Sequence, residues 1–320
     1  MQEADYRQLI EDLKLALAQN ADSTFAIIGH TPLTYDIIQF FRAAGAQDRL
    51  LGVYSKDVTQ NGRSTLLRRI DLIGQDMPDV VVIASDSEKE ELLELAVPHL
   101  SAGVRVIFGG YAHFEFRDSV FDEVVRQSAI PSLANGYPNS LIHLYQCLQN
   151  AARMGLSGVV VEFGMFKGGT TMLLAQFVKR MGQSWTVIGF DTFAGFPAKR
   201  SVLDMYEHPD CVYRDEALVR RYLSGENIQI VAGDIIATVE RLRDEKIILA
   251  FVDTDNFTSA SAVLDVVQDR VVVGGAIVFD HFTGRNRFRY TLGERMAAKR
   301  LLMDKRFFNL HDTGVFFRQS

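Results

Sequence analysis

Cysteine is scarce in this chain, which has 2 cysteines, Cys147 and Cys211, in 320 residues. Two cysteines that form no C-x-x-C pair are too few for a disulfide-stabilised scaffold, so a reducing compartment is the simplest setting. We therefore expect a cytoplasmic protein in which both cysteines are buried as small apolar side chains.

Long apolar runs and an excess of positive charge are also missing. No run reaches the roughly 18 residues of a membrane helix, and the first ten residues lack the cationic and apolar regions of a secretory signal. The 34 basic and 40 acidic residues give a formal net charge of −6, which argues against a surface that neutralises many phosphates. Neither a membrane nor a nucleic acid is therefore expected as a partner.

The chain is long enough for two hydrophobic cores. It has 320 residues, of which 48% are hydrophobic, and single cores tend to stop growing at about 250 to 300 residues. We expect an N-terminal domain over residues 1–135 and a C-terminal domain over residues 136–320, both of the α/β class.

The first half alternates between short strands and helices. Apolar strand patterns lie at residues 24–28, 50–54, 79–84 and 104–108, with helical patterns at 34–44 and 87–100. This order predicts a small parallel α/β domain, and residues 109–139 are predicted to connect it to the second half. Its first turn has one glycine, Gly29, where a dinucleotide site would have three. We interpret it as a degenerate Rossmann-like domain for scaffolding, dimerisation or acceptor binding, in preference to nucleotide binding.

The second half repeats the alternation with longer strands. A helix is predicted at residues 139–154, and the predicted elements after it are strands at 158–163, 185–191, 228–232, 247–253 and 276–280 and a terminal hairpin of 306–310 and 315–318.

A glycine-rich turn follows the first of these strands. Gly164, Gly168 and Gly169 lie between a buried strand and a helix, where backbone without Cβ atoms and unpaired N–H groups can approach a ligand. The spacing fits neither G-x-G-x-x-G nor a P-loop. The turn indicates a nucleotide-type cofactor site of another kind, and tight packing of strand on helix is the alternative.

Carboxylates end the strands of the second half. They are Glu162, Asp191, Asp234, Asp253 with Asp255, and Asp280. The carboxyl ends of parallel strands meet at one edge of a sheet, where these groups repel one another unless a cation or hydrogen-bond donors offset them. A bound ligand or metal ion is the economical explanation.

The motifs around these residues resemble those of the macrocin and mycinamicin O-methyltransferase family over about residues 139–320. They are Glu162-Phe163-Gly164 with Gly168-Gly169, Phe190-Asp191-Thr192-Phe193-Ala194-Gly195-Phe196-Pro197, Gly233-Asp234, Asp253-Thr254-Asp255-Asn256-Phe257-Thr258-Ser259, and Gly274-Gly275-Ala276-Ile277-Val278-Phe279-Asp280-His281. The resemblance implies a class I S-adenosylmethionine (SAM)-dependent methyltransferase with a Rossmann-like sheet.

The resemblance also implies roles for single residues. Asp191 would accept the ribose hydroxyls of SAM, with a helix cap as the alternative, and Asp234 would lie beside the adenine, with a turn carboxylate as the alternative. Gly164, Gly168 and Gly169 would lie under the methionine part, and Glu162 would fix the turn or the amino group. Asp253 and Asp280 would hold magnesium or manganese, which lowers the pKa of an acceptor hydroxyl.

His281 departs from the family pattern, in which another carboxylate usually follows the position of Asp280. As a metal ligand, His281 would favour an ion softer than magnesium. Its ordinary pKa also suits a general base, and a plain capping role at the end of the strand stays open. Asp255 is read either as a carboxylate beside the metal ligands or as the cap of a helix over residues 259–267.

Two further segments bear on the acceptor. Residues 192–227 form a long connection with several aromatic side chains, which is typical of a lid or an acceptor pocket. Residues 285–306 contain eight basic side chains, which form either a docking surface for an acceptor with phosphate or carboxylate groups or a solvated helix face.

These observations predict metal-assisted O-methylation of a sugar-like or secondary-metabolite hydroxyl, with Asp253 and His281 as catalytic residues, by an enzyme that forms a homo-oligomer. The alternatives are a methyltransferase that acts on nitrogen, a non-catalytic protein that binds SAM or pairs with another enzyme, and a nicotinamide oxidoreductase that uses the first domain.

Overall fold

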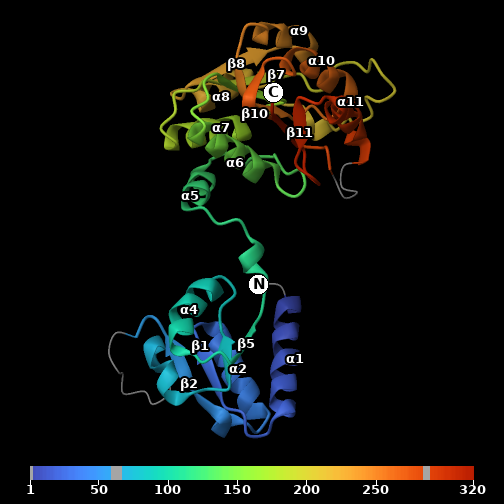
Figure 1. Ribbon diagram of the computed structural model, residues 1–320. Coiled ribbons are helices and arrows are strands. Elements are labelled where there is room, and N and C mark those ends of the chain that lie inside the picture. The colour runs from blue at the N-terminus through green and yellow to red at the C-terminus, as the bar shows by residue number, and fades with distance from the viewer. Residues whose placement is uncertain (1–2, 59–66, 284–288) are drawn as a thin grey trace. The chain divides into compact units, whose positions relative to one another are not determined.

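The chain folds into two compact units, residues 1–116 and residues 117–320. Figure 1 shows the computed structural model, which describes residues 3–58, 67–283 and 289–320. The predicted boundary at 135/136 is too late by about 19 residues. Most of the predicted connection, from residue 117 onward, belongs to the second unit. There α5 (Ser119–Gln127) packs on α7 (Gly169–Arg180), and Asp118 accepts a hydrogen bond from the Tyr145 hydroxyl at 2.8 Å.

The first unit is a parallel sheet with helices on both faces. The sheet has the order β3-β2-β1-β4-β5, and its strands are β1 (Phe25–Ile28), β2 (Leu50–Ser55), β3 (Leu67–Arg69), β4 (Val80–Ile83) and β5 (Arg105–Phe108). Its helices are α1 (Glu3–Gln19), α2 (Pro32–Ala43), α3 (Ile73–Asp76) and α4 (Lys89–Ala96). Side chains alternate along β1, so that Phe25 and Ile27 pack under α1 and α2 while Ala26 and Ile28 face α4.

Strand order in the first unit reverses between β1 and β4, which is where doubly wound folds usually bind ligands. Here the two turns are tied together, because the Thr31 hydroxyl donates a hydrogen bond to the Ala84 carbonyl. Beside them, the buried Lys89 pairs with Asp86 and donates to the Gly110 carbonyl at 3.0 Å. The predicted parallel α/β architecture is confirmed, and the role of this unit stays a prediction.

The second unit is built on a larger sheet with the order β11-β12-β10-β9-β6-β7-β8, in which only β12 runs antiparallel to its neighbours among the described strands. The strands are β6 (Val159–Phe163), β7 (Val187–Asp191), β8 (Ile228–Ala232), β9 (Ile247–Val252), β10 (Val271–Phe279), β11 (Phe307–Asn309) and β12 (Val315–Arg318). The remaining helices are α6 (Ser140–Arg153), α8 (Glu216–Leu223), α9 (Ile235–Thr238), α10 (Phe257–Val267) and α11 (Leu292–Met303).

Helices cover both faces of the second sheet. Figure 1 shows α6 and α7 on one side and α9 and α10 on the other, with α10 packed against α11. Every residue of β9 is buried, as expected for a central parallel strand with a continuous apolar sequence. Because β6, β7, β9 and β10 run parallel, the loops that follow them meet at one edge of the sheet. No helix within the described ranges is both long and apolar enough to cross a membrane.

Candidate functional site

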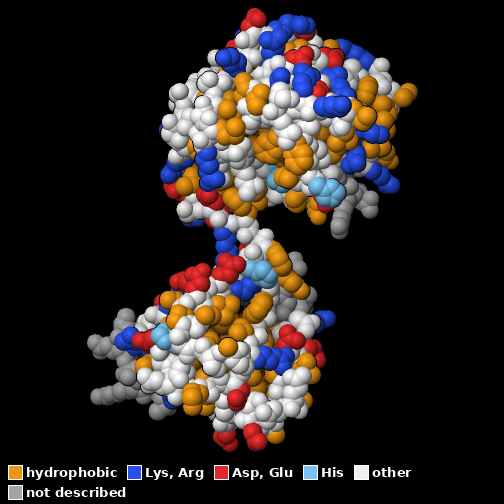
Figure 2. Space-filling model, viewed as in Figure 1, with side chains coloured by type: hydrophobic (Ala, Val, Ile, Leu, Met, Phe, Trp, Pro, Cys, Tyr) orange, Lys and Arg blue, Asp and Glu red, His pale blue; other side chains and the backbone are white. Residues whose placement is uncertain are grey.

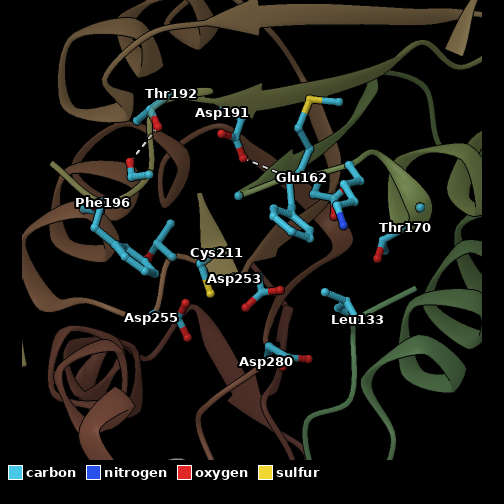
Figure 3. A pocket seen from close by; sticks show the side chains of 18 of the residues that line it. Leu133, Glu162, Thr170, Asp191, Thr192, Phe196, Cys211, Asp253, Asp255 and Asp280 are labelled. Atoms are coloured by element: carbon cyan, nitrogen blue, oxygen red, sulfur yellow. Dashed lines mark hydrogen bonds between the residues drawn. The ribbon is translucent and has the colours of Figure 1, made fainter. Parts of the chain in front are cut away.

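A cavity of about 430 Å³ lies at the carboxyl edge of the second sheet. Its walls come from the loops after β6, β7, β9 and β10, from residues 130–135, and from the 192–227 connection. Figure 3 shows Asp253, Asp255 and Asp280 gathered on one side of it, with Glu162 and Asp191 toward the other side. The predicted convergence of strand-end carboxylates on one edge is present.

Glu162 lies near the end of β6 with 1% of its surface exposed. Its Oε2 accepts a hydrogen bond from the hydroxyl of Thr171, in the first turn of α7. Burial raises the pKa of Glu162 to about 8, and the negative charges of Asp191 and Asp280 act in the same direction. Glu162 is thus a largely protonated side chain at neutral pH that ties β6 to α7.

The glycines of the turn serve chain packing as well as the cavity. A Cβ atom on Gly164 (φ +90°) would overlap the carbonyl oxygen of Asp253, and one on Gly169 would overlap that of Pro131. Gly164 and Gly169 also line the cavity, whereas Gly168 (φ +80°) faces the side chain of Leu223. Both readings of this turn, ligand approach and tight packing, therefore apply, and the packing is between loops as well as between strand and helix.

Asp191, the last residue of β7, binds two neighbouring loops. Its Oδ2 accepts from the backbone N–H of Phe166 at 2.7 Å and its Oδ1 from that of Phe193 at 2.8 Å. Both donors have a left-handed backbone with φ of 51°, a conformation that costs energy in residues other than glycine and clusters at functional sites. Burial raises the pKa of Asp191, and the two N–H groups offset part of that rise. Asp191 is not a helix cap, and its carboxylate faces the cavity with acceptor capacity left.

Asp234 lies outside the cavity lining. It caps α9 by accepting from the N–H of Ile236 at 3.0 Å, and its Oδ2 pairs with Arg200 at 2.8 Å. The next residue, Ile235, lines the cavity instead. The geometry therefore favours the turn-carboxylate alternative for Asp234.

Asp253, Asp280 and His281 form a cluster in which one ligand atom from each lies within 4.8 Å of the others. Asp253 follows β9, and Asp280 and His281 follow β10, which pairs with β9 in parallel register. His281 Nε2 lies 3.6 Å from Asp253 Oδ1 and 3.5 Å from Asp280 Oδ2. The three residues predicted as metal ligands are thus brought together.

The protonation of this cluster reflects crowding of negative charge. Burial and the charge of Asp280 raise the pKa of Asp253 far above its ordinary value, and burial also raises that of Asp280. Burial lowers the pKa of His281, but its hydrogen bond to Asp255 and the charges of Glu294 and Asp280 outweigh this, and the pKa rises to about 9. His281 therefore holds a proton at neutral pH that a bound cation would displace.

Asp255 lies beside this cluster and not at the end of a helix. Its Oδ1 lies 3.0 Å from His281 Nε2, and its backbone is left-handed with φ of 62°. The cap position of α10 is occupied by Asn256. Of the two readings of Asp255, the carboxylate beside the ligands is the one the geometry favours.

Glu294 was missed as a site residue by the sequence argument. It lies in the first turn of α11 and is fully buried, and its carboxylate accepts from the backbone N–H groups of Thr254, Asp255 and His281. Burial raises its pKa to about 7. The only available signal was an acidic residue in an otherwise basic segment.

Residues 130–136 were predicted as part of a connection and instead form a wall of the cavity. Ile130, Pro131, Leu133 and Asn135 line it, and the N–H of Gly136 donates to Asp280 Oδ1 at 2.9 Å. No sequence motif marks this segment, because its contacts are made to strands far along the chain.

The long connection at 192–227 contributes the opposite wall. Phe196 and Tyr206 line the cavity with ring centroids 5.6 Å apart, and Tyr206 and Asn256 exchange two hydrogen bonds of 3.0 and 2.9 Å. Cys211 also lines the cavity and is half-buried, so the prediction that both cysteines are buried is wrong for Cys211 and correct for Cys147.

The basic segment does not line the cavity in its described part, residues 289–306; residues 285–288 lie outside the described ranges. Arg300 pairs with Asp265 and Arg306 with Asp269, while Arg295 donates to the carbonyl of Phe282. Figure 2 shows Lys and Arg side chains spread over the visible face of the second unit, with acidic ones among them. These pairs favour the reading as a solvated helix face.

Most of the second unit matches the profile of one known family. A profile of the family described as macrocin-O-methyltransferase (TylF) matches residues 131–319. No curated protein matches the chain. Solved structures with a similar fold include the O-methyltransferase NovP, with 18% identity over 56% of this chain and 79% of NovP and a TM-score of 0.48. The calicheamicin methyltransferase CalS11 has 20% identity over 66% of this chain and 97% of CalS11, with a TM-score of 0.45. The S-adenosylhomocysteine (SAH)-bound methyltransferase PaMTH1 of Podospora anserina has 11% identity over 64% of this chain and 89% of PaMTH1, with a TM-score of 0.41.

Proposed function

The chain belongs to the macrocin-O-methyltransferase (TylF) family of SAM-dependent O-methyltransferases, and on that basis we propose that it methylates a hydroxyl group of a sugar-like secondary metabolite with the help of a divalent metal ion. One observation carries the metal part of the proposal. The ligand atoms of Asp253, Asp280 and His281 lie within 4.8 Å of one another in the cavity that Gly164 and Asp191 also line.

The cofactor half of the cavity would hold SAM along the loops after β6 and β7. Asp191 has lone pairs left after its two backbone hydrogen bonds, so it can accept the two ribose hydroxyls. Gly164 lets the loop after β6 pass close to the loop after β9, which brings the cofactor half and the metal ligands together. When bound, SAM supplies an electrophilic methyl group on a sulfonium, and the acidic lining suits that positive charge.

The metal half fits a divalent cation by the chemistry of its donors. Two carboxylates and an imidazole form a mixed oxygen and nitrogen set, which suits manganese or a softer ion better than magnesium. Burial raises the pKa values of Asp253 and Asp280, and the charge of Asp280 adds to the rise at Asp253, so a nearby cation would stabilise the ionised forms of both carboxylates. A metal ion held there would lower the pKa of an acceptor hydroxyl.

His281 needs a free lone pair on Nε2 to act as a ligand or as a base. In the structure Nε2 is 3.0 Å from Asp255 Oδ1, an arrangement that stabilises the protonated imidazole. His281 Nε2 must therefore give up this proton, and with it the hydrogen bond to Asp255, before it can act as a ligand or a base.

The part of the cavity left for the acceptor has apolar walls and few cationic side chains. Leu133 and Phe196 flank it in Figure 3, and Lys167 is the only lysine or arginine among the described lining residues. The Lys167 ammonium lies over the rings of Phe166 and Tyr213, at 4.9 and 5.2 Å from their centroids. An acceptor with a phosphate or carboxylate group would place that group at Lys167, whereas the acidic remainder of the lining favours a neutral acceptor.

Calorimetry on the full chain tests both halves. SAH is expected to bind the wild type, and Mn²⁺ is expected to bind the wild type but not Asp253→Asn. Asp244→Asn, the same chemical change at an exposed position, is the matched control and should bind Mn²⁺ normally. Failure of SAH to bind folded protein would contradict the cofactor site. Equal Mn²⁺ affinity in the wild type and Asp253→Asn would contradict the metal site.

A further inference from the structure

Glu294 is a buried carboxylate whose partners are all in the loops that bear the candidate metal ligands. Its Oε2 accepts from the N–H groups of Thr254 and Asp255, each at 2.9 Å, and its Oε1 accepts from the N–H of His281 at 3.1 Å. A carboxylate that accepts several backbone N–H groups forms strong, charge-assisted hydrogen bonds.

These donors lie directly beside the candidate ligands along the chain. Thr254 and Asp255 follow Asp253 after β9, while His281 follows Asp280 after β10. Glu294 thus connects two loops that are also joined by the pairing of β9 with β10, which ends with the N–H of Asp280 bonded to the Val252 carbonyl, and by the contact of His281 Nε2 with Asp255 Oδ1 at 3.0 Å. One side chain from a third element holds both loops at a fixed spacing.

The start of α11 is itself held in place by close packing. A Cβ atom on Gly293 would overlap the carbonyl oxygen of Leu203 and lie 3.0 Å from the N atom of Phe257. The first turn of α11 is therefore pressed against the 203 loop and the start of α10, and Glu294 has little freedom to move away from its three donors.

Glu294 is not among the cavity-lining residues and is not in the ligand cluster. We propose that Glu294 is a positioning residue that sets the spacing of the metal ligands on the loops after β9 and β10. This inference rests on the proposed metal site. Polar groups that hold metal ligands in place typically change metal affinity about 10- to 100-fold when they are replaced.

The substitution Glu294→Gln separates positioning from simple space filling. Glutamine has nearly the same size, but its NH₂ group cannot accept a hydrogen bond and would face an N–H group from one of the two loops. Either the loop after β9 or the loop after β10 should therefore lose its hydrogen bonds to residue 294. Asp118→Asn is the control, because Asp118 caps α5 and accepts from the N–H groups of Val120 and Phe121, which are neither beside a ligand nor part of the segments that hold α11.

The experiment is titration of the full chain with Mn²⁺ and, separately, with SAH. For Glu294→Gln we expect Mn²⁺ affinity to fall about 10- to 100-fold while SAH affinity changes less than about threefold, and for Asp118→Asn we expect Mn²⁺ affinity close to that of the wild type. A purely structural role would instead lower both affinities together or neither.

Each outcome decides between the proposals. Wild-type Mn²⁺ affinity in Glu294→Gln, or an equal loss in Asp118→Asn, overturns the role of Glu294. Absence of Mn²⁺ binding to the wild type overturns the metal site itself. If Glu294→Gln does not fold, Glu294→Asp, which keeps the charge but withdraws the carboxylate by one methylene, takes its place in the same comparison.

Discussion

His281 Nε2 lies 3.0 Å from Asp255 Oδ1, so the one imidazole of the site is oriented by a carboxylate that is not itself in the ligand cluster. The substitution His281→Asp restores the carboxylate usual at this position in the family. We expect it to shift the preference toward Mg²⁺, because magnesium prefers oxygen ligands, by about 10-fold or more in the ratio of Mn²⁺ to Mg²⁺ affinity. Competition titrations measure the ratio, and an unchanged ratio would rule out His281 as a ligand.

The resemblance assigned both Asp191 and Asp234 to the cofactor, but in the structure only Asp191 of the two lines the cavity. Asp191→Asn should weaken SAH binding by about 10- to 100-fold, since it replaces an acceptor that also orders the loops at Phe166 and Phe193. Asp234→Asn should have a much smaller effect, because Asp234 caps α9 and pairs with Arg200 outside the cavity. Calorimetry with SAH distinguishes them, and equal losses would restore Asp234 to the cofactor site.

The stability of the metal-free protein should fall as pH rises from about 5 to about 8. Glu162, with its pKa raised to about 8, and Glu294, with its pKa raised to about 7, bind more protons in the folded state than in the unfolded state over this interval. Unfolding free energy decreases with pH wherever the folded state binds more protons. His281, whose pKa rises to about 9, acts in the same direction, since the stability it contributes below pH 6.5 is lost toward pH 9.

Thermal unfolding in EDTA across this pH interval measures the effect. Mn²⁺ should raise the melting temperature more at pH 8 than at pH 6, because a cation replaces the protons that the cluster otherwise needs. A melting temperature that rises steadily with pH in EDTA would contradict the raised pKa values of Glu162, Glu294 and His281 as the main cause of the pH dependence of stability.

Gly164 should be far less tolerant of substitution than Gly182. Alanine at Gly182 (φ +67°) meets no atom within 4 Å and should cost only the left-handed backbone strain of about 1 to 2 kcal/mol. Alanine at Gly164 has the same kind of strain and also a Cβ that overlaps the Asp253 carbonyl. We expect Gly164→Ala to be less stable than Gly182→Ala in denaturant unfolding and to lose Mn²⁺ affinity. Similar stability of the two variants would contradict the close approach of the loops.

Sequence patterns were sufficient for the parts of the fold that depend on local signals. The central strands β6, β7 and β9 lie where continuous apolar runs predicted them, and the carboxylates that follow them converge because parallel strands end at a common edge. The strand β3 and the helix α5 were missed. The first is only three residues long, and the second is amphipathic but lies within a stretch whose prolines and glycine indicated a loop.

The unpredicted parts of the site depend on contacts between distant segments. The hydrogen bond from Gly136 to Asp280 spans 144 residues, and the bonds from Glu294 reach back about 40 residues to the loop after β9. Neither pattern nor spacing reports such pairs. For the same reason, the sequence could not decide between the two readings of Asp234, because it did not reveal that Arg200 and the first turn of α9 use its carboxylate.

Diffraction from crystals grown with SAH and Mn²⁺, measured at the manganese absorption edge, tests the central claim most directly. The account predicts one anomalous peak bounded by Asp253, Asp280 and His281, and SAH in the same cavity with its ribose at Asp191. A peak elsewhere, or SAH bound away from Asp191 and Gly164, would contradict it.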